Sequence, residues 1–280
     1  MLKSADKSVD QRFSTRIGLI LSALGIAVGT GNIWRFPRIA AQNTGDTGAG
    51  AFLIAWVIFL FMWSIPLIIA EYISGRKQRS GVIRVFIRSM GSRFAWIGSF
   101  VAFVPLAITF YYSVVVGWCA YYFIYTAFHP LPGNFESAMA IWNQYQASYW
   151  PVVTHLFAVT FGLFAVWKGV RSIERVNKVL IPSLLIIVII SLARALTLPG
   201  AGVGLSYLFT PDLKQLLNFK TWIDALTQNA WDTGAGWGLF MTYAAYMKKE
   251  HGAVGNAFLS GIGNNSVSIL AGIMVFGTVF

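Results

Sequence analysis

Seven long apolar stretches constrain this chain more than any other feature of its sequence. They span residues 17–34, 50–70, 94–128, 149–167, 179–193, 225–247 and 253–280, and only one of them contains a charged residue. A bilayer core takes about 20 apolar residues per helix, and continuous apolar runs differ from the alternating pattern of a membrane barrel. Only 11% of the residues are charged, less than half of the share that is usual in soluble domains. The sequence therefore predicts an all-helical, polytopic transmembrane bundle.

Two of these stretches differ in length from a simple span. The third, 94–128, is longer than a bilayer core requires, so we expect its helix to tilt or to project beyond the membrane. The fifth, 179–193, is short, and we expect its helix to continue past Arg194, whose long side chain can reach the interface.

The basic residues indicate how the bundle is oriented. With the N-terminus inside, 16 of the 21 Lys and Arg residues fall on the internal side, in segments 1–16, 71–93, 168–178 and 248–249. Short loops rich in Lys and Arg stay in the cytoplasm, so we expect a cytoplasmic N-terminus and a multi-pass protein of the cell membrane. The net charge of +11 then reflects topology and contact with anionic lipid, and no nucleic-acid partner is expected.

Two stretches carry glycine clusters that argue against continuous helices. Residues 25–32 hold three glycines in the sequence GIAVGTGN, and residues 231–238 hold three more in WDTGAGWG. Glycine costs about 1 kcal/mol relative to alanine in a helix interior. Non-helical backbone survives at membrane depth only where it is buried in protein or lines a cavity. Two unwound helices are one interpretation, and close helix packing of the Gly-xxx-Gly kind is the other.

Asp232 favours the interpretation with unwound helices. A carboxylate near the membrane midplane costs at least about 2.5 kcal/mol, so it should face a partner or a wet cavity. A structural hydrogen bond to a neighbouring helix is the alternative role. Glu71 lies at the inner edge of the second stretch, near Arg76, and there we expect a solvated or structural role rather than an ion site. Breaks in the first and sixth helices suggest two repeats of five helices with a site between them.

A membrane-embedded enzyme is a different class of function, and it finds little support. His129, His155 and His251 are scattered near loops without metal-ligand spacing, and Cys119 is the single cysteine. No pairing of a nucleophile with a base stands out along the chain. We therefore expect no catalytic residues.

Residues 25–37, with the sequence GIAVGTGNIWRFP, resemble the first-helix signature of the neurotransmitter:sodium symporters. Further marks of that family follow in order at 48–52, 66–71, 111–112, 173–182 and 210–212. The resemblance implies an inverted-repeat sodium symporter fold with broken helices 1 and 6, of the bacterial or archaeal amino-acid transporter type. The implied division is a cytoplasmic tail (1–16), a first repeat (17–200), an extracellular loop (201–222) and the start of a second repeat (223–280).

The resemblance also implies two sodium sites. Hard oxygen ligands, which a hard cation prefers, make the first site, together with the substrate carboxylate. They are the Ala27 carbonyl, the Asn32 side chain, Asp232 and Asn264. The second site would use the carbonyls of Gly25 and Val28 with groups from helix 8.

A substrate site follows from the same resemblance. The residues expected in it are Ala27, Gly29, Thr30, Gly31, Ile108, Tyr112, Trp231, Asp232, Gly234 and Trp237. The substrate carboxylate would meet the N–H groups of Thr30 and Gly31 and the Tyr112 hydroxyl. Trp231 would be the aromatic lid and Arg35 half of the outer gate. Packing or interface roles are the alternative for the aromatic residues and the arginine.

Three positions depart from the family pattern. Asp232 stands where Ser or Thr is usual, and Trp56 stands where chloride-dependent members have a tyrosine, whereas Gln228 and Ser268 retain chloride-site identities. We expect the Asp232 carboxylate to supply the negative charge that chloride supplies elsewhere, so that chloride is not required. Gly29 replaces the aspartate of monoamine carriers and favours an amino acid as substrate. Bulky groups around the side-chain pocket favour a small one.

Family members continue for four or five helices beyond the position of Phe280. We therefore expect a truncated chain without helices 8 and 10, which would not transport alone. The predicted function is sodium-coupled symport of a small amino acid, with one or two sodium ions. A non-transporting membrane scaffold or regulatory partner is the alternative, and a homo-oligomer is compatible with the sequence.

Overall fold

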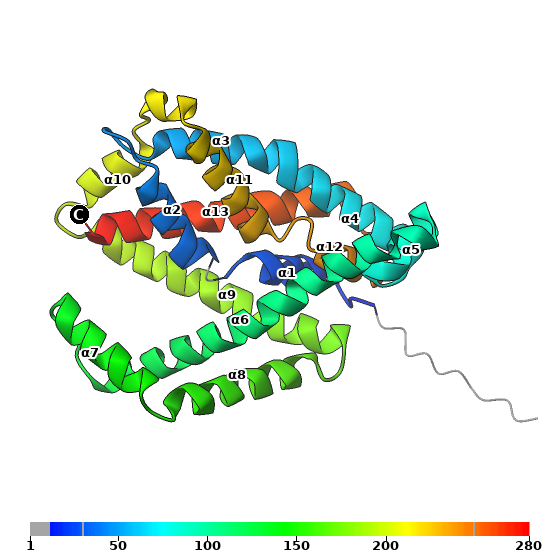
Figure 1. Cartoon of the computed structure of the whole chain (residues 1–280), viewed down its shortest axis with the longest axis horizontal. Coiled ribbons are helices and arrows are strands. Elements are labelled where there is room, and N and C mark those ends of the chain that lie inside the picture. The colour runs from blue at the N-terminus through cyan, green and yellow to red at the C-terminus, as the bar shows by residue number, and fades with distance from the viewer. Residues whose placement is uncertain (1–11, 30, 249, 280) are drawn as a thin grey trace, which may run out of the picture.

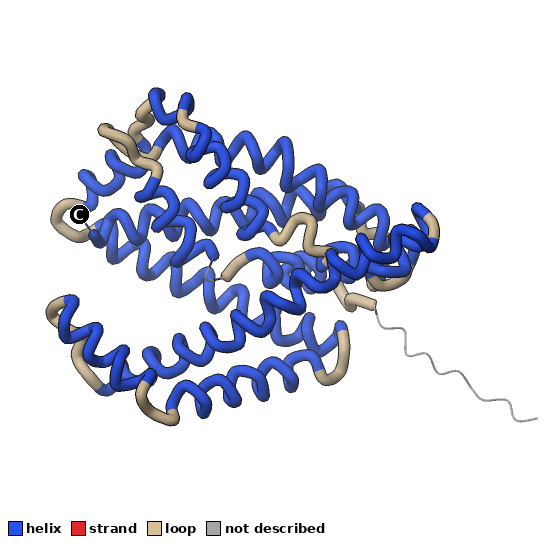
Figure 2. The backbone as a smooth tube through the Cα atoms, viewed as in Figure 1, coloured by secondary structure: helices blue, strands red, loops and turns tan. Residues whose placement is uncertain are grey.

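The structure is a computed structural model that describes residues 12–29, 31–248 and 250–279. Those residues form helices and no strand, and one isolated antiparallel bridge joins Ala49 to Pro211 (Figure 2). The all-helical class expected from the sequence is confirmed.

Thirteen α-helices are present in these ranges. They are α1 (Arg16–Ala27), α2 (Phe36–Gln42), α3 (Gly50–Phe59), α4 (Ile65–Gln78), α5 (Val82–Met90), α6 (Ala95–Phe128), α7 (Phe135–Gln146), α8 (Trp150–Val166), α9 (Val170–Leu196), α10 (Ala201–Phe209), α11 (Phe219–Thr233), α12 (Leu239–Ala245) and α13 (Ala253–Val279). Two π-helical turns, Gly31–Arg35 and Leu60–Ser64, precede α2 and α4. Two 3-10 turns, Ser92–Phe94 and Leu213–Leu217, precede α6 and α11.

Four helical segments are long and apolar enough to cross a membrane, and the number is six when each of two bent pairs counts as one span. The four are Gly50–Gln78, Ser92–Phe128, Val170–Leu196 and Ala253–Val279. The bent pairs are α1 with Gly31–Gln42 and α7 with α8. The remaining predicted stretch, 225–247, does not meet this criterion because it is divided between α11 and α12.

The third and fifth stretches lie in α6 and α9, two of the long helices of the bundle. α6 has 34 residues, or about 51 Å at the rise of an α-helix, which exceeds a bilayer core of about 30 Å. α9 continues past Arg194 to Leu196, as expected, but it begins at Val170, well before the predicted stretch. A hydropathy argument misses these first turns because they carry several charged residues.

The first helix is broken where the sequence predicts. α1 ends at Ala27, and Val28 has an extended backbone. The chain then continues through the π-helical turn Gly31–Arg35 into α2, and the two helical segments meet at a bend of 47°. The glycine cluster therefore marks an unwound helix.

The second break, between α11 and α12, depends directly on glycine. Gly234, Gly236 and Gly238 have φ angles of 65°, 89° and 73°. Residues with a Cβ are strained in this left-handed region, whereas glycine is not. These glycines let the chain leave α11 at Thr233 and start α12 at Leu239 within a few residues.

The halves of the two broken helices pack into two different hydrophobic cores. One core contains side chains of α1 and α12, including Leu19 and Phe240, and the other contains side chains of α2 and α11, including Phe36 and Ala225. α1 packs against α9 and α13, while α11 packs against α3 and α12 against α4. α6, α7 and α8 lie together along one side of the bundle (Figure 1). Each half of a broken helix is therefore held by its own core. The polar backbone of the breaks connects the two halves.

Candidate functional site

A cavity of about 990 Å³ opens beside the two helix breaks, between α1, α6, α8 and α11. The predicted site residues that line it are Gly25, Ala27, Val28, Gly29, Gly31, Ile108, Tyr112, Trp231, Asp232 and Trp237. Gly234 is not among its lining residues, and Thr30 lies outside the described residues. The wall formed by α8, with His155 and Val159, was not predicted, because no local sequence signal links that helix to α1.

Asp232 is buried at the end of α11, with 2% of its surface exposed. Its Oδ2 atom accepts hydrogen bonds from Gln228 Nε2 at 2.6 Å and from Ser268 Oγ at 3.1 Å. Its Oδ1 atom is buried and has no hydrogen-bond partner among the described residues. A buried carboxylate oxygen without a partner is costly. The carboxylate is therefore satisfied on one side and open to a cation on the other.

Asn264, on α13, brings further oxygens to the same place. Its side-chain amide lies 3.2 Å from the carbonyl oxygens of both Ala27 and Asp232, and it donates to both of them when its nitrogen faces them. In the reverse orientation Asn264 Oδ1 accepts from Asn32 Nδ2 at 2.8 Å, and Asn264 Nδ2 donates to Asn265 Oδ1 at 3.1 Å. The first orientation satisfies the two carbonyls without an ion, and the second would add the amide oxygen to them as a third hard ligand for a bound cation. The residues present therefore fit a sodium ion.

Asn32 is the predicted ligand whose geometry differs from the expectation. Its Oδ1 atom accepts from the Gly29 N–H at 2.8 Å, and its Nδ2 atom donates to Asn264 Oδ1 and to Ser268 Oγ, each at 2.8 Å. Asn32 is fully buried. In this conformation its oxygen secures the unwound segment of the first helix, and rotating the amide by half a turn would direct that oxygen toward Asn264.

Arg35 lies beside this cluster. Its guanidinium donates to Gln228 Oε1, and its Cζ atom lies 5.6 Å from the centroid of the Trp231 ring. Since Gln228 also donates to Asp232, one amide connects the arginine to the carboxylate. The predicted gate residues Arg35 and Trp231 are thus in contact with each other and with the sodium-site candidate.

Three aromatic side chains surround the cavity at the level of the breaks. The ring centroids of Tyr112 and Trp231 are 6.2 Å apart, and those of Trp231 and Trp237 are 5.7 Å apart in an edge-to-face arrangement. Trp231 therefore lies between the other two rings. This arrangement gives an apolar lining beside the oxygen cluster, a combination that is typical of small-molecule sites.

The residues predicted for a second sodium site, Gly25 and Val28, also line the cavity. A Cβ atom at Gly25 would lie 2.8 Å from Asn177 Oδ1 on α9, so this glycine permits the close approach of α1 and α9. In the described part of the chain no group of three or more His, Cys, Asp or Glu side chains could hold a metal ion. The candidate cation ligands are therefore mainly carbonyl and amide oxygens.

Glu71 has a structural role that the sequence indicated only as one of two alternatives. It is 5% exposed and accepts hydrogen bonds from the N–H groups of Gly236 (2.7 Å), Gly238 (3.3 Å) and Met241 (3.2 Å). Gly236 and Gly238 belong to the break between α11 and α12, and Met241 lies in the first turn of α12. Glu71 therefore supplies the acceptors that the unwound backbone lacks, and the solvated role is wrong.

Replacing Glu71 with alanine should destabilise the fold strongly. Three N–H groups, two of them buried, would lose their acceptor, and each buried group left unpaired costs about 1–3 kcal/mol. We expect the melting temperature of the purified chain in detergent to fall by about 10 °C. Glu136→Ala, at an exposed glutamate on α7, should lower it by about 2 °C or less. Equal shifts for the two variants would contradict the role given to Glu71.

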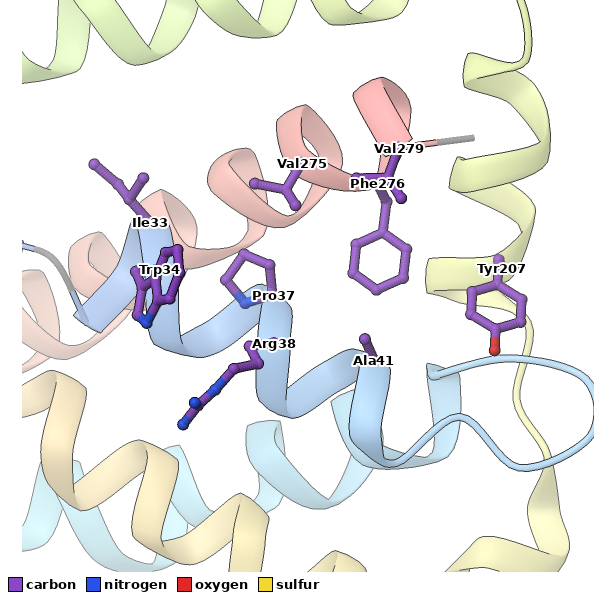
Figure 3. Close-up of a pocket in the computed structure, with 9 residues that line it drawn as sticks. All are labelled: Ile33, Trp34, Pro37, Arg38, Ala41, Tyr207, Val275, Phe276 and Val279. Atoms are coloured by element: carbon purple, nitrogen blue, oxygen red, sulfur yellow. The ribbon is translucent and has the colours of Figure 1, made fainter. Parts of the chain in front are cut away.

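A second cavity, of about 530 Å³, lies between α2, α10 and α13. Figure 3 shows Val275 and Phe276 of α13 facing Pro37 of α2 across it. None of the predicted sodium or substrate residues lines it. It is apolar and lacks the convergent polar groups of the site beside the helix breaks.

Comparison with known proteins identifies the family. The sequence matches the model of the Sodium:neurotransmitter symporter family over residues 10–149 and 143–279. The chain belongs to this family. Its members are transporters rather than enzymes, and sodium dependence is a property of the family.

Relatives of this family member include prokaryotic and animal transporters. The chain is 34% identical to an uncharacterised sodium-dependent transporter of Methanocaldococcus jannaschii, over 96% of its own length and 56% of that protein. It is 29% identical to the sodium-dependent neutral amino acid transporter B(0)AT3 of Mus musculus, over 96% of its length and 48% of that protein. The chain therefore spans about half the length of the curated relatives that it matches.

A solved structure supports the same assignment. The crystal structure of MhsT in complex with L-phenylalanine matches with a TM-score of 0.86 at 30% identity, covering 96% of this chain and 61% of MhsT. The inverted-repeat symporter fold with broken helices 1 and 6 is confirmed by this match. The chain is that of a multi-pass membrane protein, and family membership does not favour the alternative of a non-transporting scaffold.

Proposed function

We propose that this chain forms the sodium and substrate site of a symporter that carries a small amino acid across the cell membrane by alternating access. Residues 17–200 are the first repeat, 223–280 begin the second, and 201–222 form the extracellular connection, which contains α10. The N-terminus is cytoplasmic, because that orientation places most basic residues inside. The activity belongs to the complete transporter, since helix 8 groups complete the second sodium site.

The observation that carries this proposal is the convergence of oxygens at the two helix breaks. The carbonyls of Ala27 and Asp232 and the side chain of Asn264 lie together, and Asp232 Oδ1 is unpaired beside them. This chain would bind a sodium ion there with neutral oxygens and one carboxylate. A substrate carboxylate would complete the coordination, which makes the affinity for each depend on the other.

The substrate would lie between the sodium ion and the aromatic rings. Its carboxylate would accept from the Gly31 N–H and the Tyr112 hydroxyl, near the ends of the half-helices. Its amine would donate to carbonyls of Ala27 and Trp231. Trp231, covered by Arg35 at 5.6 Å, would close over the substrate on the outer side.

Chloride would not be required. Gln228 and Ser268, which retain chloride-site identities, both donate to Asp232 Oδ2. That carboxylate oxygen therefore occupies the position in which these two donors would bind an anion. A fixed negative charge next to the ion offsets its charge in a poorly solvated site.

Sodium-stimulated binding of a labelled amino acid tests the proposed function. Binding of tritiated L-alanine and L-phenylalanine to the purified chain in lipid nanodiscs should rise when sodium replaces potassium. Tyr112→Phe removes a hydroxyl that would bond the substrate carboxylate, and a charge-assisted hydrogen bond is worth about 1.5–3 kcal/mol. We expect the affinity to fall about 10- to 100-fold in that variant.

Tyr111→Phe is the matched control for this measurement. Tyr111 is the neighbouring residue, is 57% exposed and does not line the cavity. Its substitution should change the affinity less than about twofold. Binding that ignores sodium, or that weakens equally in both variants, would overturn the proposed substrate site.

A further inference from the structure

α7 lies between α6 and α8 in the chain, at the end of these two helices that is away from α5 (Figure 1). α8 has 17 residues, or about 26 Å at the rise of an α-helix, and so covers most of a bilayer core of about 30 Å. α7 and α8 meet at a bend of 74°. When α8 crosses the bilayer, α7 therefore lies nearly in the plane of the membrane.

One face of α7 is held against α6 by aromatic rings. Tyr145 is 1% exposed, and its ring centroid lies 4.2 Å from that of Tyr121. Trp142 stacks on Tyr122 with ring centroids 6.4 Å apart, and it meets Trp118 edge-to-face at 5.1 Å. These contacts restrain rotation of α7 about its own axis, so its other faces have a defined direction.

The two remaining faces of α7 differ in polarity. Phe135 and Met139 lie one turn apart on the same face, and they are 80% and 38% exposed. Glu136 and Gln144 are exposed on a second face, which is centred about 120° away around the helix at 100° per residue. A helix with one packed, one apolar and one polar face fits the boundary between hydrocarbon and water.

α6 exposes large apolar side chains at the height of α7. Phe123 and Ile124 directly follow Tyr122, which stacks on α7, and they are 76% and 58% exposed, while Phe128 in the last turn is 81% exposed. They belong to Ser92–Phe128, a segment long and apolar enough to cross a membrane. The apolar surface of this span is therefore continuous with α7.

The composition around α7 is that of a membrane boundary. Tyr and Trp, which form the rings between α6 and α7, are enriched where a bilayer meets water. Among residues 128–149 the only Asp, Glu, Lys or Arg is Glu136, and it lies on the polar face. The exposed apolar face of α7 thus adjoins a lipid-facing surface and carries no charge of its own.

We propose that α7 is an interfacial helix that inserts Phe135 and Met139 among the lipid acyl chains of the leaflet at this end of the bundle. The polar face with Glu136 and Gln144 points to water, and the ring contacts with α6 fix the depth of the helix. None of these residues belongs to the sodium or substrate site. This contact with lipid therefore holds or fails independently of the proposed function.

Spin labels on single cysteines of α7 test this proposal by electron paramagnetic resonance, with the purified chain in dioleoylphosphatidylcholine nanodiscs. Cys119, which is exposed, is first replaced by Cys119→Ser. Labels at Phe135→Cys and Met139→Cys should collide with oxygen, which dissolves in hydrocarbon, more often than with the water-soluble complex NiEDDA. We expect the ratio of the two collision rates there to be at least about fivefold higher than on the polar face, because hydrocarbon excludes a polar complex.

Glu136→Cys and Gln144→Cys are the matched controls, because they are exposed positions on the same helix. Their labels should collide with NiEDDA more often than with oxygen. Equal ratios at all four positions, with ready access of NiEDDA, would overturn the proposal by placing α7 in water. Slow collision with both reagents at Phe135→Cys and Met139→Cys would also overturn it, because protein, such as a second copy of this chain, would then cover the apolar face.

Discussion

Asp232→Ser should make sodium binding depend on chloride. In chloride-free gluconate medium we expect the affinity of this variant for sodium to fall at least about 30-fold, because a buried carboxylate next to the ion is lost. Wild-type binding should be the same in chloride and in gluconate. Adding chloride should restore much of the affinity of the variant, since Gln228 and Ser268, whose N–H and O–H groups now bond Asp232 Oδ2, would face the space left by the carboxylate.

The measurement is the binding of radioactive sodium to the purified chain in nanodiscs, with and without amino acid. Asp224→Asn is the matched control, because Asp224 lies on the same helix two turns away and pairs with Lys220 at 2.5 Å. That substitution should alter sodium affinity less than about twofold. A wild-type protein that binds sodium only in chloride, or an Asp232→Ser variant with unchanged sodium affinity, would show that the carboxylate does not replace the anion.

The helix breaks were predictable because their cause is local. A glycine cluster inside an apolar stretch indicates where a helix unwinds, and both breaks occur within the glycine-containing segments 25–32 and 231–238. The start of α9 was not predictable in this way. Its first turns carry charges that are stabilised by Ser14 and Thr15, residues about 160 positions away in the sequence.

For the site, too, features with a local cause were predictable and features that depend on the fold were not. Burial of Asp232 followed from the cost of a charge at membrane depth, and the structure gives it polar partners on α11 and α13. Glu71 was equally acidic, but only the fold shows that its carboxylate faces the N–H groups after α11. The amide orientation of Asn32 was also not predictable. Its Oδ1 atom accepts a hydrogen bond from the Gly29 N–H, and this contact is known only from the fold.

These observations assign different tasks to two buried acids beside the helix breaks. Glu71 accepts hydrogen bonds from two N–H groups of the unwound segment and from one in the first turn of α12, and therefore stabilises the break. Asp232 keeps one oxygen without a partner among the residues that the structure describes, and therefore leaves the break able to bind an ion. Loss of Glu71 should chiefly affect stability, whereas loss of Asp232 should chiefly affect binding.

Gly31→Ala should abolish most sodium-stimulated amino-acid binding. A Cβ atom at Gly31 would lie 2.7 Å from Asp232 Oδ1 and 3.2 Å from Trp231 Cδ1. It would overlap with Asp232 Oδ1, the oxygen proposed to bind sodium, and crowd Trp231, the proposed lid. Overpacking of this kind costs about 1–3 kcal/mol, which corresponds to a loss of about 5- to 150-fold in affinity when the strain falls on the binding groups.

Two other glycines separate crowding from a general effect of the substitution. At Gly29 an added Cβ would meet no atom within 4 Å, so Gly29→Ala should reduce the affinity far less than Gly31→Ala, although both positions line the cavity. Gly202, on α10, has equally open surroundings and lies away from the site, and Gly202→Ala should leave binding unchanged. The order of the three affinities, measured with the labelled amino acid in sodium, therefore reports the contact between the first helix and Asp232. If Gly29→Ala reduced binding as much as Gly31→Ala, the close approach of Gly31 to the carboxylate would not be the cause.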